Sequence, residues 1–379
     1  MHALIIDAPS ALSRARIYGL TLAQRAAFAA TDAGAETVEF EPETAPLFSG
    51  LPAALSAKLP LHPRGNQGGE RLIVRADALV APALLAALEF GESVVDAHGQ
   101  RCAARVLIAP GADAATALAT TRPHAFTADR HHYALRVTER AQLAAIRQLL
   151  LRSLTKPSDG PVSRNLNRPL SGALTSLCVP LGITPNQMTV LVALAGLLAA
   201  YFASIPSYAA QLLGAALFQL HSIIDGCDGE IARLTRRFGK HGALIDSLVD
   251  DASNTLFFAG LSLGVARAEQ TTWPLYTGAL TVLCYAAVAW IQYASVLRST
   301  GKGEKTRFWQ GSSLHEHGLL RALHALGRRD VFVLVILLAV AAGLSKVVVA
   351  VLPLMALGAL TQSVRNARAL RNAGASAGV

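Results

Sequence analysis

Four aspartates between residues 225 and 250 carry the chemistry that this sequence suggests. Asp225 and Asp228 lie three residues apart, and Asp246 and Asp250 lie four residues apart. On a helix, either spacing puts both carboxylates of a pair on one face. Two neighbouring helices could therefore direct all of these carboxylates into one cavity, where like charges need a cation between them. Ligation by oxygen alone suits magnesium, manganese or calcium rather than zinc.

The residues between the aspartates add to this pattern. Gly229, Ala232 and Gly242 lack bulk, which leaves room for a flat base or for a close helix contact. Arg233 can reach a phosphate with the planar set of N–H donors of its guanidinium group. A simpler interpretation is a set of solvated carboxylates at helix ends, with small residues for packing. Carboxylates embedded among apolar runs are rare and usually mark function, which favours the metal site.

The complete pattern, D-x2-D-G-x2-A-R-x8-G-x3-D-x3-D, resembles the signature of the CDP-alcohol phosphotransferase family, with every fixed position filled. The segment Ile183-Thr184-Pro185-Asn186-Gln187 is also similar to the element that precedes the first membrane helix in that family. The resemblance covers the chain from the end of its front domain onward, and it implies a six-helix membrane domain and a homodimer.

The resemblance implies a reaction of phospholipid or phosphodiester synthesis. A substituted phosphate would pass from a CDP-alcohol, of the CDP-diacylglycerol or CDP-inositol type, to an acceptor alcohol, with release of CMP. Two divalent cations, Mg²⁺ or Mn²⁺, would be bound, and Asp250 would also act as the general base. The implied metal ligands are Asp225, Asp228, Asp246 and Asp250. The implied nucleotide-binding residues are Asn186, Asp228, Gly229, Ala232, Arg233 and Gly242.

Several basic residues are candidates for binding a phosphorylated polar acceptor, such as an inositol phosphate. They are Arg164, Arg168, Lys302, Lys305, Arg307 and Arg329. The alternative is that these residues follow the positive charge bias of cytoplasmic loops and contact anionic lipid headgroups. His221, one helical turn before Asp225, suits a place near the site and a role in helix packing equally well.

The composition indicates a membrane protein. Of the 379 residues, 52% are hydrophobic and only 16% are charged, which is too apolar for an ordinary soluble enzyme. The net charge of +9 comes from basic residues that lie between apolar runs rather than along one patch. Loops that flank membrane spans explain this distribution better than nucleic-acid binding does. Membrane lipids are therefore expected partners, and nucleic acid is not.

Six apolar runs in the second part of the chain have lengths typical of membrane spans. They lie near residues 187–205, 208–226, 243–265, 273–296, 330–344 and 347–363. Basic residues concentrate in alternate loops, which predicts a multi-pass protein of the inner (cytoplasmic) membrane with both termini in the cytoplasm.

The front part alternates short strand-like and helical stretches, which predicts a cytoplasmic α/β domain. The strand candidates are Leu4–Ile6, Leu72–Val74 and Val106–Ile108, and the helix candidates are Thr21–Asp32, Pro82–Glu89 and Glu139–Leu154. We expect this domain over residues 1–155, a linker with an interfacial amphipathic helix over 156–186, a helical membrane domain over 187–365 and a basic tail over 366–379. No signal peptide is visible at the N-terminus.

A front α/β domain before such a membrane domain resembles the inositol-phosphate cytidylyltransferase fusion proteins. The segment from Lys156 to Pro169 is similar to their junction, as is Arg329-Asp330-Val331-Phe332 before the fifth span. A working nucleotidyltransferase needs a glycine-rich loop after its first strand, and a nearby lysine, to bind a triphosphate. Residues 7–19 provide neither. The front domain is therefore predicted to be a catalytically inactive, nucleotidyltransferase-like domain with a structural or regulatory role.

Two other functions fit embedded carboxylates. A non-catalytic membrane scaffold could hold a structural cation, but it would not need Gly229, Ala232, Arg233 and Gly242 at these offsets. An ion transporter also lines its path with acids. Transport would require polar residues through the whole span, whereas these acids cluster near one membrane face.

Overall fold

The computed structural model describes residues 1–6, 12–41, 44–48, 51, 53–66, 68–239, 242–298 and 328–376. The chain divides into two compact units. The first contains Met1–Pro157 together with Ser176–Gly182 and Glu230–Arg237. The second contains Ser158–Thr175, Ile183–Gly229 and Phe238–Val379.

A seven-stranded mixed sheet, with strand order β10-β8-β9-β6-β1-β4-β5, organises the first unit. Its strands are β1 (His2–Ile6), β4 (Thr37–Phe40), β5 (Leu61–Pro63), β6 (Gly69–Arg75), β8 (Glu92–Val95), β9 (Arg101–Ile108) and β10 (Arg122–Pro123). Strand β1 is parallel to β4 and β6, and β9 is antiparallel to β6 and β8. Two small antiparallel pairs join β2 (Arg16–Ile17) to β3 (Leu20–Thr21) and β7 (Ala78–Val80) to β11 (Ala134–Arg136).

Helices cover both faces of this sheet, which explains why β1 is a continuous apolar run rather than an alternating one. Ala3 and Ile5 pack into one hydrophobic cluster, whereas Leu4 and Ile6 pack into another on the opposite face. The helices of this unit are α1 (Leu22–Asp32), α2 (Ala45–Phe48), α3 (Ala53–Ser56), α4 (Pro82–Ala87), α5 (Ala114–Ala119) and α6 (Gln142–Ser153). The predicted strand cores lie in β1, β6 and β9, and the predicted helices correspond to α1, α4 and α6. The α/β class is thus confirmed.

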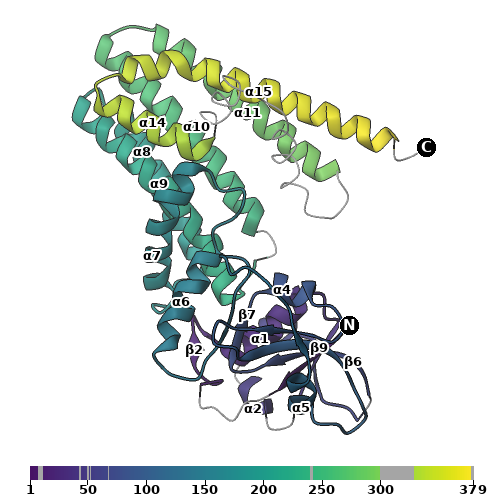
Figure 1. The fold of residues 1–379 in the computed structure, drawn as a ribbon. Coiled ribbons are helices and arrows are strands. Elements are labelled where there is room, and N and C mark those ends of the chain that lie inside the picture. Colours follow the sequence, from purple (N-terminus) through teal and green to yellow (C-terminus); the bar gives the residue numbers. More distant parts are fainter. Residues whose placement is uncertain are drawn as a thin grey trace. The chain divides into compact units, whose positions relative to one another are not determined.

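The described part of the second unit is helical. A π-helical turn at Ser163–Asn167 precedes α7 (Arg168–Cys178), whose last residues belong to the first unit. The long helices are α8 (Pro185–Ala203), α9 (Tyr208–Thr235), α10 (Gly242–Glu269), α11 (Trp273–Arg298), α14 (Arg329–Ala341) and α15 (Ser345–Ser376). Helix α15 runs beside α11 over much of its length (Figure 1).

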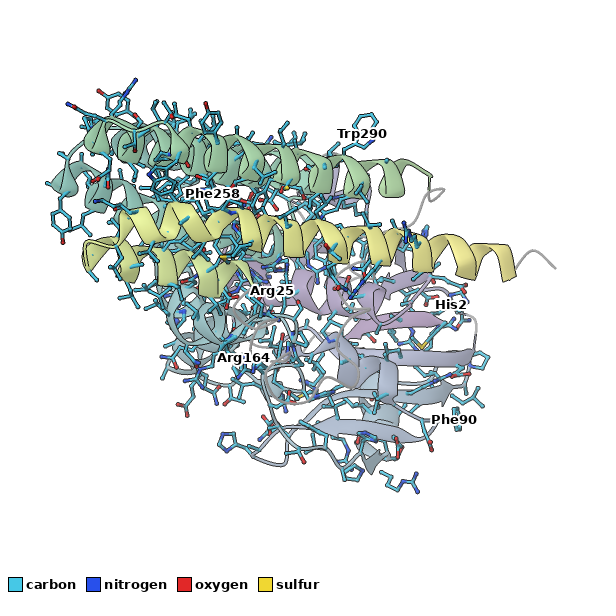
Figure 2. All side chains as sticks on the ribbon, turned by 90° about the horizontal axis from the view of Figure 1, so that it is seen from above. His2, Arg25, Phe90, Arg164, Phe258 and Trp290 are labelled. Carbon is cyan, nitrogen blue, oxygen red and sulfur yellow. The ribbon has the colours of Figure 1, made fainter. Side chains whose placement is uncertain are left out.

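An aromatic cluster joins α9, α10 and α14, and it also reaches Tyr285 of α11. Phe218 of α9 stacks on Phe257 of α10, with ring centroids 4.0 Å apart and planes only 5° from parallel. The next residue, Phe258, points into the bundle (Figure 2) and contacts Phe332 of α14. Aromatic pairs of this kind stabilise packing by more than their buried area alone would, so this cluster holds α9, α10 and α14 together. It lies about two helical turns from Asp225 along α9 and from Asp250 along α10.

Small residues let the helices approach closely, as they do in membrane bundles. A Cβ atom added to Gly264 of α10 would collide with the carbonyl oxygen of Ala203 on α8. One added to Gly260, one turn earlier, would lie 3.1 Å from the carbonyl carbon of Ala200. On α9, a Cβ on Gly214 would lie 2.6 Å from the backbone nitrogen of Ala203. The crossings of α8 with α9 and α10 therefore depend on glycine.

Three of the described helices are long and apolar enough to cross a membrane, at Pro185–Ala203, Trp273–Ala294 and Ser345–Ala369. These are α8, α11 and the first part of α15, so the chain is a membrane protein. The expectation of six such spans is not met among the described residues. Helix α14 has only 13 residues, and α9 and α10 carry aspartates. Helix α9 also buries Gln211, Gln219 and His221, which lower its mean hydropathy although packing hides them.

We expect Gly264→Val to lower the melting temperature of the protein in detergent by about 5 °C, because overpacking against a backbone carbonyl costs about 2 kcal/mol. Gly358→Val is the matched control, since a Cβ on Gly358 of α15 would meet no described atom within 4 Å. Equal melting temperatures for the two variants would contradict the close crossing of α8 and α10.

Candidate active site

Three of the four motif aspartates meet in space. Asp225 comes from α9, and Asp246 and Asp250 come from successive turns of α10. Each offers a carboxylate oxygen, and these three oxygens lie within 4.8 Å of one another. All three residues are half-buried. The separation is small enough for one divalent cation to contact all three carboxylates.

The chemistry of this group fits a hard divalent cation. Its donors are all carboxylate oxygens, the ligands that magnesium and manganese prefer. Oδ1 of Asp225 and Oδ1 of Asp250 are buried, and neither accepts a hydrogen bond from a described residue. Buried polar atoms are normally satisfied, so two such oxygens facing a common centre need a partner that the described chain does not supply.

Asp228 has a different environment from the other three aspartates. Its Oδ2 accepts a hydrogen bond of 2.9 Å from the hydroxyl of Thr189, and its Oδ1 lies against the backbone N–H of Gly229. Asp228 is only 8% exposed. Its place outside the three-carboxylate group neither supports nor contradicts the predicted role as a metal ligand, which stays a prediction.

The start of α8 positions Thr189. Thr184 caps the helix in a reciprocal capping box with Gln187, and Pro185 occupies the first helical position. The residue types in the segment from Ile183 to Gln187 are thus explained locally, because they determine where α8 begins. Thr189 follows one turn later and reaches Asp228 from the neighbouring helix.

Arg329, the first residue of α14, supplies positive charge to the aspartate group. Its Nη1 donates to Oδ2 of Asp225 at 3.0 Å and also to Oδ2 of Asp250. Its Nη2 lies 3.1 Å from Nε2 of His221. The sequence suggested Arg329 as an acceptor-binding residue; the structure places it on the carboxylates. Because Arg329 is far from both aspartates in the sequence, no local sequence pattern indicated this contact.

His221 forms the layer behind Arg329. Its ring is fully buried, and Nδ1 lies 3.2 Å from the carbonyl oxygen of Val192 on α8. A carbonyl can only accept, so Nδ1 carries the hydrogen and Nε2 is left to accept from Arg329. This tautomer lets a neutral imidazole orient the guanidinium. The only signal in the sequence was the one-turn spacing from Asp225.

The predicted nucleotide-binding residues lie along α9 and at the starts of α8 and α10. Ala232 and Arg233 follow Asp228 and Gly229 by four residues each, so each pair shares a face of α9. Asn186 is exposed near the start of α8, with its Oδ1 4.0 Å from where a Cβ on Gly239 would stand.

Gly242 has no packing reason to be glycine. It opens α10, its φ angle is not in the left-handed region, and a Cβ there would meet no described atom within 4 Å. A glycine needed neither for backbone freedom nor for packing among the described residues leaves space for a ligand.

The other acceptor candidates are paired or lie outside the described residues. The carboxylate of Asp159 accepts two bonds from Arg168, of 2.9 and 3.1 Å. Arg164, labelled in Figure 2, donates to the carbonyl oxygen of Asp159. Lys302, Lys305 and Arg307 lie outside the described residues. Acceptor binding by any of these residues remains a prediction.

Comparisons with known proteins agree with the motif. Residues 182–356 match the model of the CDP-alcohol phosphatidyltransferase family. The chain is 33% identical to the bifunctional IPC transferase and DIPP synthase of Archaeoglobus fulgidus over 188 residues, which are 49% of this chain and 33% of that protein. A protein of the same name from Aquifex aeolicus is 40% identical over 105 residues, 28% of this chain and 23% of the relative.

A second kind of relative is the archaetidylinositol phosphate synthase of Pyrococcus horikoshii, which is 36% identical over 84 residues, 22% of this chain and 43% of that protein. Each of these alignments spans less than half of the relative's own length. The similarity therefore identifies a domain of this chain, not the activity of any whole relative.

We expect Asp246→Asn to weaken Mn²⁺ binding at least about tenfold, because it removes one of three converging carboxylates. The measurement is Mn²⁺ titration of the protein in detergent, followed by electron paramagnetic resonance. Asp251→Asn is the matched control: the carboxylate of Asp251 accepts a hydrogen bond of 2.7 Å from the hydroxyl of Tyr293 and is not one of the three. Equal affinity in the two variants would exclude a metal site at this group.

Arg329→Gln should make folding depend more strongly on metal. Without the guanidinium, the carboxylates of Asp225 and Asp250 lose a counter-charge, which should cost about 2 kcal/mol in EDTA. Added Mg²⁺ should then raise the melting temperature more in this variant than in the unaltered protein. Arg328→Gln is the control, because Arg328 pairs with Asp330 and contacts no aspartate of the group. An equal Mg²⁺ response in both variants would argue against the role of Arg329.

Proposed function

We propose that this chain, which carries a CDP-alcohol phosphatidyltransferase domain over residues 182–356, transfers a substituted phosphate from a CDP-alcohol to an acceptor alcohol and releases CMP. The observation that carries the proposal is the convergence of Asp225, Asp246 and Asp250 within a space of metal size. The donor is of the CDP-diacylglycerol or CDP-inositol type. Such a reaction belongs to phospholipid biosynthesis.

In this proposal Asp225, Asp246 and Asp250, together with Asp228, hold two divalent cations, Mg²⁺ or Mn²⁺. When bound, these cations neutralise the charge of the pyrophosphate and of the transferred phosphoryl group. Asp250 also takes the proton of the acceptor hydroxyl. Its Oδ2 is engaged by Arg329, whereas Oδ1 accepts no hydrogen bond from a described residue and is the oxygen able to do this.

The substrates would lie on either side of these carboxylates. The cytidine diphosphate part would lie against Asp228, Gly229, Ala232, Arg233 and Gly242, with Asn186 at its edge. An inositol phosphate is the acceptor that we favour, because a relative is named archaetidylinositol phosphate synthase. Arg164, Arg168, Lys302, Lys305, Arg307 and Arg329 are its candidate ligands.

We also propose that α9, α10 and α14 lie in the membrane beside the three apolar helices. Packing supports this, since the aromatic cluster of Phe218, Phe257 and Phe332 ties these helices together. The buried polar side chains of α9 face protein rather than lipid. The protein would then be a multi-pass protein of the inner membrane with both termini in the cytoplasm. A homodimer is proposed from the family resemblance alone.

The front domain is proposed to have no nucleotidyltransferase activity of its own. It is an α/β domain, as in the fusion proteins that the chain resembles, but residues 7–19 contain neither a glycine-rich loop nor a lysine. Its role would then be structural or regulatory.

The test is CMP release by the purified protein in detergent, with CDP-diacylglycerol or CDP-inositol and a panel of polyol-phosphate acceptors. We expect release with Mg²⁺, none with EDTA, and a loss of at least about a hundredfold in Asp250→Asn, which removes both a ligand and the base. Asp251→Asn should retain most of the activity. Full activity of folded Asp250→Asn would exclude its role as base, and metal binding without CMP release would favour the scaffold.

A further inference from the structure

The end of α9 folds with the front domain. Residues Glu230–Arg237 belong to the same compact unit as Met1–Pro157, although they continue the helix that carries Asp225 and Asp228. Leu234 is only 2% exposed and is part of the main hydrophobic cluster of the front domain. The segment that follows the first two aspartates by one or two turns is therefore packed by residues from the start of the chain.

One face of α1 makes the polar contacts with this segment. Arg25, Phe28 and Asp32 are spaced by three and four residues, so they share a face of the helix. A reciprocal capping box of Thr21 and Gln24 stabilises the N-terminus of α1. All three side chains of that face contact residues between Leu234 and Arg236.

Arg25 caps the C-terminus of α9. Its Nη2 donates to the carbonyl oxygen of Leu234 at 3.0 Å and to that of Ile17 at 2.5 Å. The last carbonyls of a helix have no partner within the helix and carry partial negative charge, so a cation there is favourable. Burial, and then the positive charge of Arg236, lower the pKa of Arg25 to about 10. Burying a charged arginine costs free energy unless it makes hydrogen bonds, and here the carbonyl oxygens of Leu234 and Ile17 accept them.

Asp32 forms an ion pair with Arg236, the first residue after α9. Arg236 follows the last residue of the helix and has φ of +59°, a left-handed conformation that helix ends usually assign to glycine. Its guanidinium forms a two-point ion pair with the carboxylate of Asp32, with Nη1 3.1 Å from Oδ1. The same group lies 5.0 Å above the ring of Phe28. These contacts fix both the side chain and the backbone at the point where the chain turns toward α10.

We propose that Arg25 and Asp32 are positioning residues for the nucleotide site: they hold the end of α9 and so set the place of Arg233, which lies on the last turn of that helix. The front domain thereby acts as a support for the transfer reaction rather than as a second enzyme. This inference rests on the proposed function, because the site it supports is the nucleotide site of that reaction.

The primary test is Asp32→Ala in the full chain, because Asp32 is partly exposed and its loss should not unfold the domain. Glu36→Ala is the matched control, since Glu36 is exposed and pairs only with the amino terminus at 3.7 Å among the ion pairs of the described residues. Amide hydrogen exchange is the first readout, and it does not depend on activity. We expect faster exchange over residues 234–239 in Asp32→Ala and unchanged exchange in α8.

Steady-state kinetics of CMP release is the second readout. We expect Asp32→Ala to raise KM for the CDP-alcohol about fivefold, the size set by a partly exposed ion pair, with kcat and Mn²⁺ affinity nearly unchanged. The reversed pair, Asp32→Arg with Arg236→Asp, should restore the low KM, because aspartate tolerates the left-handed conformation. A variant that was merely less stable would lose kcat and active protein instead.

Two results would overturn the inference. One is unchanged exchange over residues 234–239 in Asp32→Ala. The other is faster exchange with a wild-type KM for the CDP-alcohol. Failure of the proposed function looks different, because the unaltered protein would then release no CMP with any donor. In that case KM would be replaced by the dissociation constant of CMP, measured by calorimetry, with the same expected ratio between the variants.

Discussion

The repulsion among carboxylates in an apolar helical bundle is the constraint on which the rest of this structure depends. Three negative groups whose oxygens lie within 4.8 Å of one another cannot share a site without positive charge between them. Arg329 supplies part of that charge from α14, and His221 orients it from behind. The proposed cations would supply the remainder. The site therefore needs α9, α10 and α14 together, and the aromatic cluster below it joins these same helices.

The polar groups that this site requires also alter the composition of its helices. Gln219, His221 and the aspartates make α9 less apolar than a helix that faces lipid on all sides. Packing removes these groups from lipid, and glycine at the crossings, as at Gly214 and Gly264, permits the close approach that this needs. The polar groups keep α9 and α10 below the hydropathy typical of a membrane span, whereas α14 is apolar but has only 13 residues. Three of the described helices therefore have both the length and the composition of a span.

Much of the fold follows from local signals. The short apolar run at Leu4–Ile6 indicated a strand, which is β1, and the helical stretch from Thr21 to Asp32 indicated the helix α1. The aspartate spacing likewise indicated two helix faces bearing acids, because helical geometry relates residues three and four apart wherever the helix lies. The sequence suggested that all four carboxylates could enter one cavity, and the structure brings together those of Asp225, Asp246 and Asp250.

The sequence by itself thus determined the α/β class of the front domain, the helical character of the second unit and the acidic faces of α9 and α10, because each depends on neighbours within one or two turns. Only the tertiary structure decided that Arg329, 79 residues after Asp250, reaches that carboxylate, and that Asp228 turns to Thr189. It also decided that Arg25 holds Leu234, 209 residues away. Such contacts depend on how distant segments pack, and no periodicity within either segment encodes its partner.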